Sequence, residues 1–284
     1  MLSSSDAIFV VGATGRVGAA LVEALRARGV PVRAGSRRAE RDSTAPGVTA
    51  VAFDMTDPQT WAPALGGARR MFLMWPPGTS PAQHVFPFLE AAQRQGLARV
   101  AFLSVLGADK VGFLPHSKIA ARLGELGLER VLLHAAYFMQ NLSTIHAEDI
   151  RERDELYLPM GAGRLAMVDV VDVAEAACVG LLDAREQISW DLTGAAALSL
   201  DDVAAELSEA LGRPIRYPRP GAWSFYRSQL RRGTAAGLAR FMVAEYTHAR
   251  LGLADRVADG VREALGRAPT SFAEFARRER DAWR

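Results

Sequence analysis

The first half of the chain alternates short apolar runs with longer stretches of helical hydrophobic spacing. The apolar runs are Ala7–Val11, Val30–Gly35, Val48–Phe53, Arg70–Met74, Arg99–Ser104 and Arg130–His134. Because these runs lack the alternation of a strand with one face in water, they predict strands that helices cover on both sides. Strands that alternate with helices in this way predict an α/β fold built on a doubly wound parallel sheet.

Beyond residue 135 the pattern changes to helices with a few β-like pieces, which lie near Leu165–Val168 and Ser189–Thr193. We therefore expect a first domain over residues 1–134, to which a segment around 164–194 returns. A small C-terminal α+β lobe should form most of residues 135–284.

The sequence of this second part contains capping residues for both ends of one helix. Ser199 is suited to cap its beginning, with Asp202 in the capping-box position, and Gly212 is suited to end it. These residues predict an amphipathic helix over roughly 200–211.

Composition and net charge mainly exclude certain classes of binding partner. The chain has 284 residues, with 34 Lys and Arg against 32 Asp and Glu, and a formal net charge of +2. So small a charge gives no reason to expect nucleic acid or an acidic membrane as a partner, which leaves a small-molecule substrate. Cys178 is the single cysteine, and no apolar stretch reaches the roughly 18 residues of a bilayer span. We expect a cytoplasmic protein, monomer or homodimer, with no metal and no membrane attachment.

The strongest chemical signal is the glycine-rich turn after the first predicted strand. The residues Gly12-Ala13-Thr14-Gly15-Arg16-Val17-Gly18 separate that strand from a helical run. Gly12 permits a tight turn, Gly15 lets the backbone approach a pyrophosphate, and Gly18 allows close packing of the helix. The order of strand, turn and helix predicts a dinucleotide site of the Rossmann type; a purely structural turn is the alternative.

Residues at the ends of the second and third strands refine the choice of dinucleotide. Ser36-Arg37-Arg38 stands where NAD-preferring folds usually carry an acid for the ribose 2′-hydroxyl. These side chains can instead hold a 2′-phosphate by charge-assisted hydrogen bonds, which predicts NADP(H); solvated surface arginines are the alternative. Asp54 and Met55 are placed to meet the adenine ring, and a helix-capping role for Asp54 is the alternative.

Four further segments join the glycine turn in suggesting a family. They are His116-Ser117-Lys118, Tyr137-Phe138-Met139-Gln140-Asn141, Val168-Asp169-Val170-Val171-Asp172-Val173-Ala174 and Leu211-Gly212-Arg213-Pro214-Ile215. With the Gly-Ala-Thr-Gly-x-x-Gly turn, they resemble the NmrA-like atypical short-chain dehydrogenases over nearly the whole chain. Within that group, the chain is similar to quinone and triphenylmethane dye reductases and to ergot-alkaloid iminium reductases.

This resemblance implies a Rossmann domain, a C-terminal substrate lobe and NADP(H) as cofactor. Several members of the family reduce quinones, dyes or iminium ions, whereas others bind the dinucleotide without turnover and act as redox-sensing regulators. We therefore expect an NADPH-dependent reductase. An NADP(H)-sensing regulator and a redox-neutral or isomerising enzyme are the alternatives.

The proton donor of typical short-chain dehydrogenases is absent from the sequence. Those enzymes use Tyr-x-x-x-Lys, and if Lys118 is that lysine, Leu114 stands at the position of the phenol. Leucine cannot donate a proton. Hydride addition to an iminium ion or a cationic dye neutralises positive charge and needs no acid at the first step. We therefore expect a small, flat, electrophilic substrate: a quinone, an iminium ion or a conjugated carbonyl.

The catalytic candidates are polar residues near the carboxyl ends of predicted strands or on the segments that follow. His116, Ser104 and Tyr137 could each protonate a quinone oxygen. Lys118 is expected to bind the nicotinamide ribose. The structural alternatives are capping or packing for His116, a loop hydrogen bond for Ser104 and a surface ion pair for Lys118.

Apolar side chains beyond the strand ends are candidates for the wall of the site. Met74-Trp75-Pro76-Pro77 follows the fourth strand, and its prolines stiffen a loop suited to lie beside the nicotinamide. Tyr137, Phe138, Met160 and Phe225 could add apolar surface, which favours a flat substrate. For Phe138 and Phe225, a place in the core of the lobe is an equal alternative.

Overall fold

The computed structural model describes residues 7–38, 45–76 and 78–284. These residues form two compact units. Unit 1 comprises the described residues up to 135 together with Val170–Leu192 and Gly260–Arg267, and unit 2 comprises Ala136–Asp169, Thr193–Asp259 and Ala268–Arg284. None of the helices in the described ranges is both long and apolar enough to cross a membrane.

Unit 1 is built around a seven-stranded sheet in the described part of the chain, and all its strand pairings are parallel. The strand order is β3-β2-β1-β4-β5-β6-β8, in which the first six strands have the Rossmann order. The strands are β1 (Ile8–Val11), β2 (Val32–Ser36), β3 (Val48–Ala52), β4 (Arg70–Met74), β5 (Arg99–Val105), β6 (Glu129–Ala135) and β8 (Gln187–Leu192). The prediction of a Rossmann-type α/β fold is confirmed.

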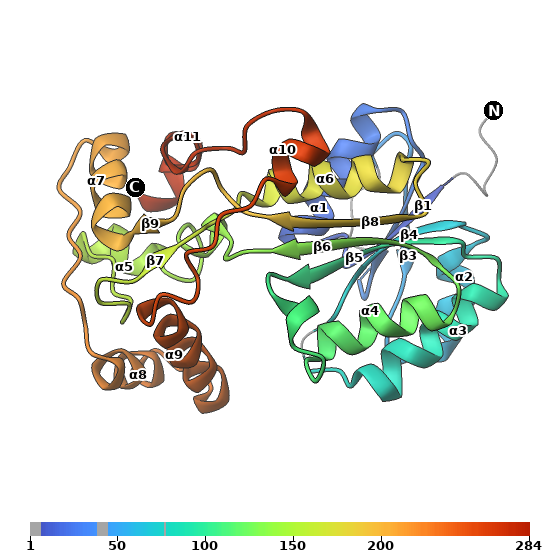
Figure 1. Cartoon of the computed structure of the whole chain (residues 1–284), viewed down its shortest axis with the longest axis horizontal. Helices are drawn as coiled ribbons and strands as arrows, with labels where there is room; N and C mark the ends of the chain where they lie inside the picture. The colour runs from blue at the N-terminus through green and yellow to red at the C-terminus, as the bar shows by residue number, and fades with distance from the viewer. Residues whose placement is uncertain (1–6, 39–44, 77) are drawn as a thin grey trace. The chain divides into compact units, whose positions relative to one another are not determined.

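Helices cover both faces of this sheet, which explains why the middle of each central strand is apolar (Figure 1). One face carries α1 (Arg16–Ala27), α6 (Val170–Leu182) and α10 (Gly260–Leu265), and the other carries α2 (Trp61–Leu65), α3 (Phe86–Arg94) and α4 (Pro115–Glu125). Short helical turns are η3 (Pro58–Thr60), η4 (Pro81–Val85) and η5 (Ala108–Lys110). Under the second face, Phe53 packs against Phe9 and Phe88 with ring centroids 5.2 and 5.1 Å apart.

The two edge strands differ from the central ones. In β3, Thr49 and Ala52 are exposed, so the expectation of helices on both sides is wrong for this strand. β8 alternates between buried Ile188 and Trp190 and exposed Gln187 and Ser189. An edge strand has a neighbour on one side only, and helices cover it less completely.

One segment of unit 1 comes from far along the chain. Residues 260–267 lie in unit 1, although the sequence groups them with the C-terminal lobe. A Cβ on Gly260 would lie 2.3 Å from the carbonyl oxygen of Asp191, at the end of β8. Glycine therefore lets the backbone of α10 pack directly on the strand.

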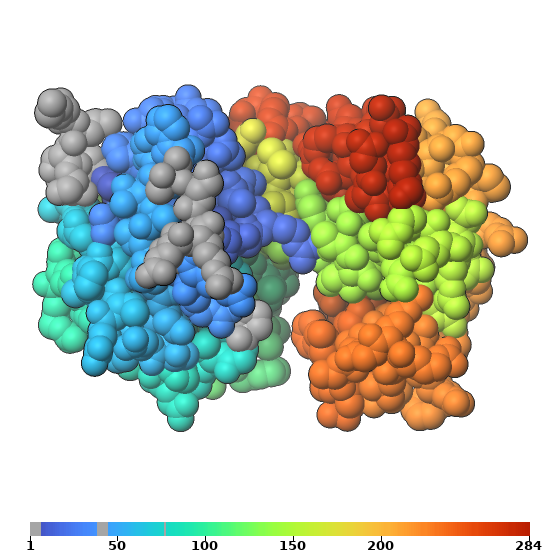
Figure 2. Space-filling model, turned by 180° about the vertical axis from the view of Figure 1, so that it is seen from behind, coloured from blue at the N-terminus to red at the C-terminus, as the bar shows by residue number. Residues whose placement is uncertain are grey.

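Unit 2 has a hydrophobic core of its own, in which Phe225, Phe275 and Trp283 are fully buried. Its elements are η6 (Met139–Asn141), α5 (Ala147–Arg153), β7 (Arg164–Leu165), β9 (Leu198–Ser199), α7 (Leu200–Leu211), α8 (Ala222–Arg231), α9 (Ala236–Arg250), α11 (Phe272–Arg278) and η7 (Arg280–Trp283). β7 pairs with β9 in antiparallel fashion. Figure 2 shows the segment after β6, in yellow-green, between the α8–α9 pair in orange and α11 in red.

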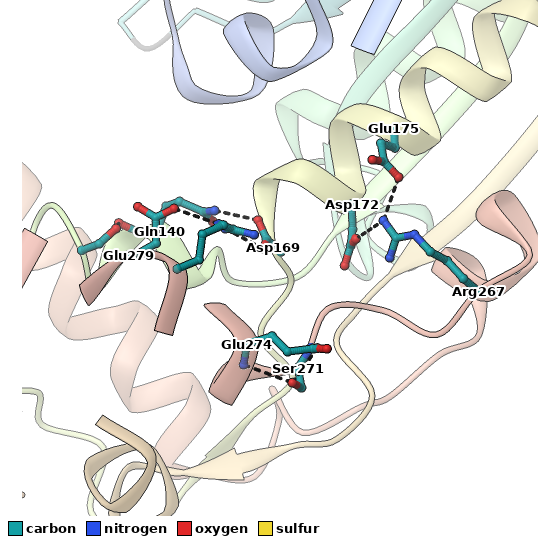
Figure 3. Close-up of polar contacts among 10 residues, drawn as sticks. Gln140, Asp169, Asp172, Glu175, Arg267, Ser271, Glu274 and Glu279 are labelled. Atoms are coloured by element: carbon teal, nitrogen blue, oxygen red, sulfur yellow. Dashed lines mark hydrogen bonds and ion pairs between the residues drawn. The ribbon is translucent and has the colours of Figure 1, made fainter. Parts of the chain in front are cut away.

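The helix ends of unit 2 follow local rules. The Ser199 side chain accepts from Asp202 N–H and the Asp202 side chain accepts from Ser199 N–H, so the predicted capping box of α7 is confirmed. Gly212 ends the helix in the left-handed region, with φ +66°. A second box, between Ser271 and Glu274, opens α11 (Figure 3).

Candidate functional site

The turn between β1 and α1 is packed too closely for any residue but glycine at two positions. Gly12 has φ +69°, in the left-handed region. A Cβ on Gly18 would lie 2.2 Å from the carbonyl oxygen of Gly12. Gly15 is the N-cap of α1, and its N–H donates to Gly12 O at 2.9 Å. The first N–H groups of a helix have no intrahelical partner and carry a positive field, so this turn has the form of an anion site.

Within the turn, the side chains have different surroundings. Thr14, Gly15 and Arg16 are exposed, whereas Ala13 and Val17 are buried. Val17 packs into unit 1 with its side chain, so it can meet a ligand only through its backbone.

The turn and the end of β2 together line a hollow. Thr14, Ser36, Arg37 and Arg38 line a cavity of about 620 Å³. Ser36 is buried and its Oγ accepts from Arg38 N–H at 3.0 Å, which fixes the backbone where both exposed arginines begin. The structure thus brings together four residues that the sequence predicts to hold the phosphates of a dinucleotide.

The side chains of the two residues predicted to meet adenine make contacts within the protein. Asp54 Oδ1 accepts from Thr56 N–H at 2.8 Å and from Thr56 Oγ1 at 2.7 Å. These bonds, chiefly the one from the backbone, lower the pKa of Asp54. Met55 is 3% exposed and belongs to the core under α2 and α3, so its side chain does not face a ligand, contrary to the prediction.

The end of β4 lies beside the glycine turn. A Cβ on Gly12 would meet Met74 Sδ at 2.7 Å, so the half-buried Met74 borders the turn. Trp75 Nε1–H donates to Thr79 O at 3.1 Å, and Pro76 is half-buried. Pro77 lies outside the described residues.

His116 lies on α4 between two aromatic rings. Its ring centroid is 5.2 Å from that of Trp75, in an edge-on arrangement, and 6.1 Å from that of Phe102. Burial, and then the neighbouring His134, lower the pKa of His116. Lys118 is exposed on the same helix, and Leu114 is the N-cap residue of α4.

A buried polar pair at the carboxyl ends of β5 and β6 accompanies His116. Ser104 and His134 are opposite each other in the parallel register, and they are 2% and 3% exposed. Neither Ser104 Oγ nor His134 Nδ1 has a hydrogen-bond partner within the described ranges. Sequence reasoning missed His134 as a site residue. Its polar side chain at the end of an apolar strand was the available signal.

The predicted wall residues of unit 2 divide into two groups. Tyr137 and Phe138 are half-buried, and Phe138 bridges to Val168. Met160 and Phe225 are fully buried in the hydrophobic core of unit 2. Their assignment to a substrate wall is therefore corrected to core packing, because neither presents surface to a ligand.

The acidic motif at residues 168–174 anchors chain segments (Figure 3). Asp169 is fully buried; its Oδ1 accepts from Gln140 Nε2 at 2.7 Å, and its Oδ2 lies 2.8 Å from Arg278. Asp172, also fully buried, accepts from Arg267 at 2.7 Å. Buried carboxylates need such partners, so these two acids have a structural role.

Comparison with known proteins agrees with this architecture. The model of the NmrA-like family matches residues 4–276. The NAD(P)H azoreductase of Xenophilus azovorans is 33% identical over 282 residues, which cover 95% of this chain and 96% of that protein. The agroclavine dehydrogenase of Claviceps purpurea is 28% identical over 289 residues, 98% of each chain. The prestalk A differentiation protein A of Dictyostelium discoideum is 27% identical and covers 97% of this chain and 93% of its own length.

Solved structures share the fold. The NADPH-dependent quinone oxidoreductase of Escherichia coli, in complex with NADPH, superposes with a TM-score of 0.83 at 24% identity, covering 95% of this chain and 98% of that one. The triphenylmethane reductase of Citrobacter sp., in complex with NADP(H), gives a TM-score of 0.82 at 20% identity, covering 96% and 99%. With the family model matching nearly the whole sequence, the chain belongs to the NmrA-like family.

Proposed function

We propose that this protein is an NADPH-dependent reductase of small, flat, electrophilic acceptors such as quinones, iminium ions or conjugated carbonyls. The observation that carries the proposal is the cavity lined by Thr14, Ser36, Arg37 and Arg38 beside the N-terminus of α1. The named activities of the azoreductase and agroclavine dehydrogenase relatives support oxidoreductase chemistry.

The described residues fit a phosphorylated dinucleotide. The Gly12–Gly18 turn offers helix N–H groups to the pyrophosphate, and Thr14 stands at the rim of the cavity. Arg37 and Arg38 can form charge-assisted bonds to a 2′-phosphate, and Ser36 Oγ can add a neutral one. A stretch with two arginines and no carboxylate favours NADP(H) over NAD(H).

The reduced dinucleotide, when bound, supplies a hydride to the acceptor. Lys118 is proposed to hold the nicotinamide ribose by its ammonium group. Trp75 and Pro76 are proposed to form a flat wall, because the bond from Trp75 to Thr79 fixes the indole. A fixed apolar wall excludes water and favours planar acceptors.

His116 can contribute to such a site mainly as a neutral group. Burial lowers its pKa, so a smaller fraction of it carries a second proton at neutral pH. With Leu114 at the position of the usual phenol, the described part of α4 offers no tyrosine to protonate a carbonyl acceptor. Acceptors that already carry positive charge avoid this need at the first step.

The second candidate is an NADP(H)-sensing regulator without turnover. The observation in its favour is the relative whose name is a differentiation protein and not an enzyme. Both candidates require the dinucleotide site, so they differ only in whether bound NADPH is consumed.

The discriminating experiment follows NADPH absorbance with a panel of benzoquinones, naphthoquinones, cationic triphenylmethane dyes and an iminium compound. If the protein is a reductase, NADPH should be oxidised only when an acceptor is present, at a rate that saturates with acceptor concentration. Tight NADPH binding without turnover across the panel would favour the regulator and contradict the reductase.

A further inference from the structure

Aromatic packing in unit 1 brings the residue after β3 close to the start of α3. His84 lies in η4, four residues before Phe88, and Phe88 packs on Phe53 with ring centroids 5.1 Å apart. Asp54 directly follows Phe53, and its backbone carbonyl accepts from Trp61 Nε1–H at 3.1 Å. The Trp61 ring in turn lies edge-on to Phe88, at 5.5 Å. The side chains of Asp54 and His84 therefore belong to one small region of this unit.

The Asp54 carboxylate uses one of its two oxygens within the protein. Among the described residues, only Oδ1 receives hydrogen bonds, from the N–H and the hydroxyl of Thr56. These bonds lower the pKa of Asp54, and the charges of nearby Arg37 and His84 add to the effect, so the carboxyl group is ionised at pH 7. An ionised carboxylate only accepts hydrogen bonds. The half-buried Asp54 thus presents Oδ2 as an acceptor for a ligand.

A backbone contact fixes the position of the proton on the His84 ring. Ser80 N–H donates to His84 Nδ1 at 3.2 Å. A ring nitrogen that accepts a hydrogen bond carries no proton, so neutral His84 holds its proton on Nε2. The ring is half-buried, and Nε2 has no partner within the described ranges. His84 thus presents one N–H donor.

This acceptor and this donor match one edge of adenine. No ion pair joins Asp54 to His84 in the part of the chain that the structure describes, so neither group satisfies the other. On the edge of adenine that points away from the ribose, the N6 amine donates and the N1 nitrogen accepts. Hypoxanthine reverses both atoms, because its O6 accepts and its N1–H donates.

We propose that Asp54 and His84 together recognise the adenine base of NADP(H), with Asp54 Oδ2 accepting from the N6 amine and His84 Nε2–H donating to N1. The sequence predicts a contact between Asp54 and adenine, and His84 adds the second contact and with it specificity against hypoxanthine. The proposal rests on the NADP(H) site of the proposed function, and it holds with or without turnover.

The strand order supports this position for the base. In the sheet, β2 lies between β1 and β3, so the glycine turn after β1, the arginines after β2 and Asp54 after β3 follow one another across the same edge. Arg37 lines the cavity of about 620 Å³ and also influences the Asp54 carboxylate. With the pyrophosphate on the glycine turn, the adenosine half of the dinucleotide extends over β2 towards β3.

Calorimetry with three dinucleotides tests the pair in the full-length protein. Wild-type protein should bind deamino-NADPH, in which hypoxanthine replaces adenine, roughly 10- to 100-fold more weakly than NADPH. His84→Asn keeps an oxygen where Nδ1 accepts from Ser80, and it removes the Nε2–H. This variant should bind NADPH and NADH more weakly by the same factor, roughly threefold to tenfold. Its affinity for deamino-NADPH should not fall, because hypoxanthine N1–H cannot accept a hydrogen bond.

A second variant reverses the preference without removing a side chain. In Asp54→Asn the two donors of Thr56 keep the amide oxygen at the Oδ1 position, so the NH₂ group stands where Oδ2 was. That group opposes the N6 amine of adenine and suits O6 of hypoxanthine. NADPH affinity should fall roughly 10- to 100-fold, and deamino-NADPH should bind better than it does to the wild type. Gln83→Ala, at the exposed neighbour of His84, is the matched control and should leave all three affinities unchanged.

Three results would overturn the proposal while leaving the reductase function standing. The first is equal affinity of the wild type for NADPH and deamino-NADPH, or an unchanged preference for adenine in Asp54→Asn. The second is an equal loss for NADPH and deamino-NADPH in His84→Asn. The third is a loss in His84→Asn that is confined to NADPH and spares NADH, which would place His84 on the 2′-phosphate. Wild-type protein that binds none of the three dinucleotides would overturn the NADP(H) site, and the proposed function with it.

Discussion

The close packing of α1 on its preceding turn makes Gly18→Ala a sharp perturbation. A Cβ at this position would lie 2.2 Å from Gly12 O and 2.9 Å from Ala13 Cα, which are backbone atoms. Favourable contacts between carbon and carbonyl oxygen lie near 3.3–3.6 Å, so helix and turn must separate by about 1 Å. Gly15→Ala is milder, since its Cβ would lie 3.2 Å from Gly12 O.

The expected magnitudes differ accordingly. Overpacking in Gly18→Ala should lower the free energy of unfolding by about 1–3 kcal/mol. Displacement of the helix N–H groups should weaken one or two charge-assisted bonds to the pyrophosphate, about 2–3 kcal/mol, or roughly 30- to 150-fold in NADPH affinity. Gly15→Ala should leave unfolding within about 0.5 kcal/mol of wild type, because its extended backbone suits alanine. Its added methyl group stands at the approach of the pyrophosphate and should still weaken NADPH binding.

Urea unfolding followed by circular dichroism measures the first quantity, and isothermal titration calorimetry with NADPH measures the second. Gly112→Ala is the matched control in unit 1, because nothing lies within 4 Å of its Cβ position. Wild-type stability together with wild-type NADPH affinity in Gly18→Ala would refute the packing argument and the placement of the phosphates on this turn.

Two further predictions concern unit 2. Burial raises the pKa of Glu245 from 4.5 to about 7. Between these pH values the folded state holds a proton on Glu245 that the unfolded state has lost, so stability falls as pH rises from about 4.5 through 7. Glu245→Gln should remove up to about 3 kcal/mol of this loss of stability at pH 8 and change stability little at pH 4. The exposed control Glu209→Gln should leave the pH dependence of unfolding unchanged. Identical pH profiles of unfolding for Glu245→Gln and wild type would contradict the raised pKa of Glu245. Arg232 donates to the fully buried Asp149 at 2.8 Å. Arg232→Met should therefore lower the free energy of unfolding, measured in urea, by about 3 kcal/mol. The control Arg231→Met, at an exposed neighbour, should lower it by less than about 0.5 kcal/mol. Equal costs for the two would show that the buried ion pair contributes nothing.

Much of unit 1 could be predicted because its signals are local. The run Arg70–Met74 is observed as β4 with the same bounds, and the Gly12–Gly18 turn connects β1 to α1 as its spacing requires. The coverage of β3 could not be predicted in this way. A strand has exposed faces when it stands at an edge, and its place in the sheet is decided by other strands.

The candidate site was predicted less completely, because burial depends on packing between distant segments. The sequence around the apolar residues Met55, Met160 and Phe225 is equally compatible with a place in a pocket wall and a place in a core, and the structure buries all three. Asp54 and His84 lie on different segments of the chain, so no local spacing could indicate that their side chains lie near each other.

Binding of NADPH by unit 1 is the claim on which the proposed chemistry depends, and calorimetry of the wild-type protein tests it most directly. We predict saturable one-to-one binding of NADPH, with NADH at least about tenfold weaker. In the variant with both Arg37→Ala and Arg38→Ala, NADPH affinity should fall roughly 10- to 100-fold towards that of NADH, which should barely change. No saturable heat from either dinucleotide with correctly folded protein would contradict the account.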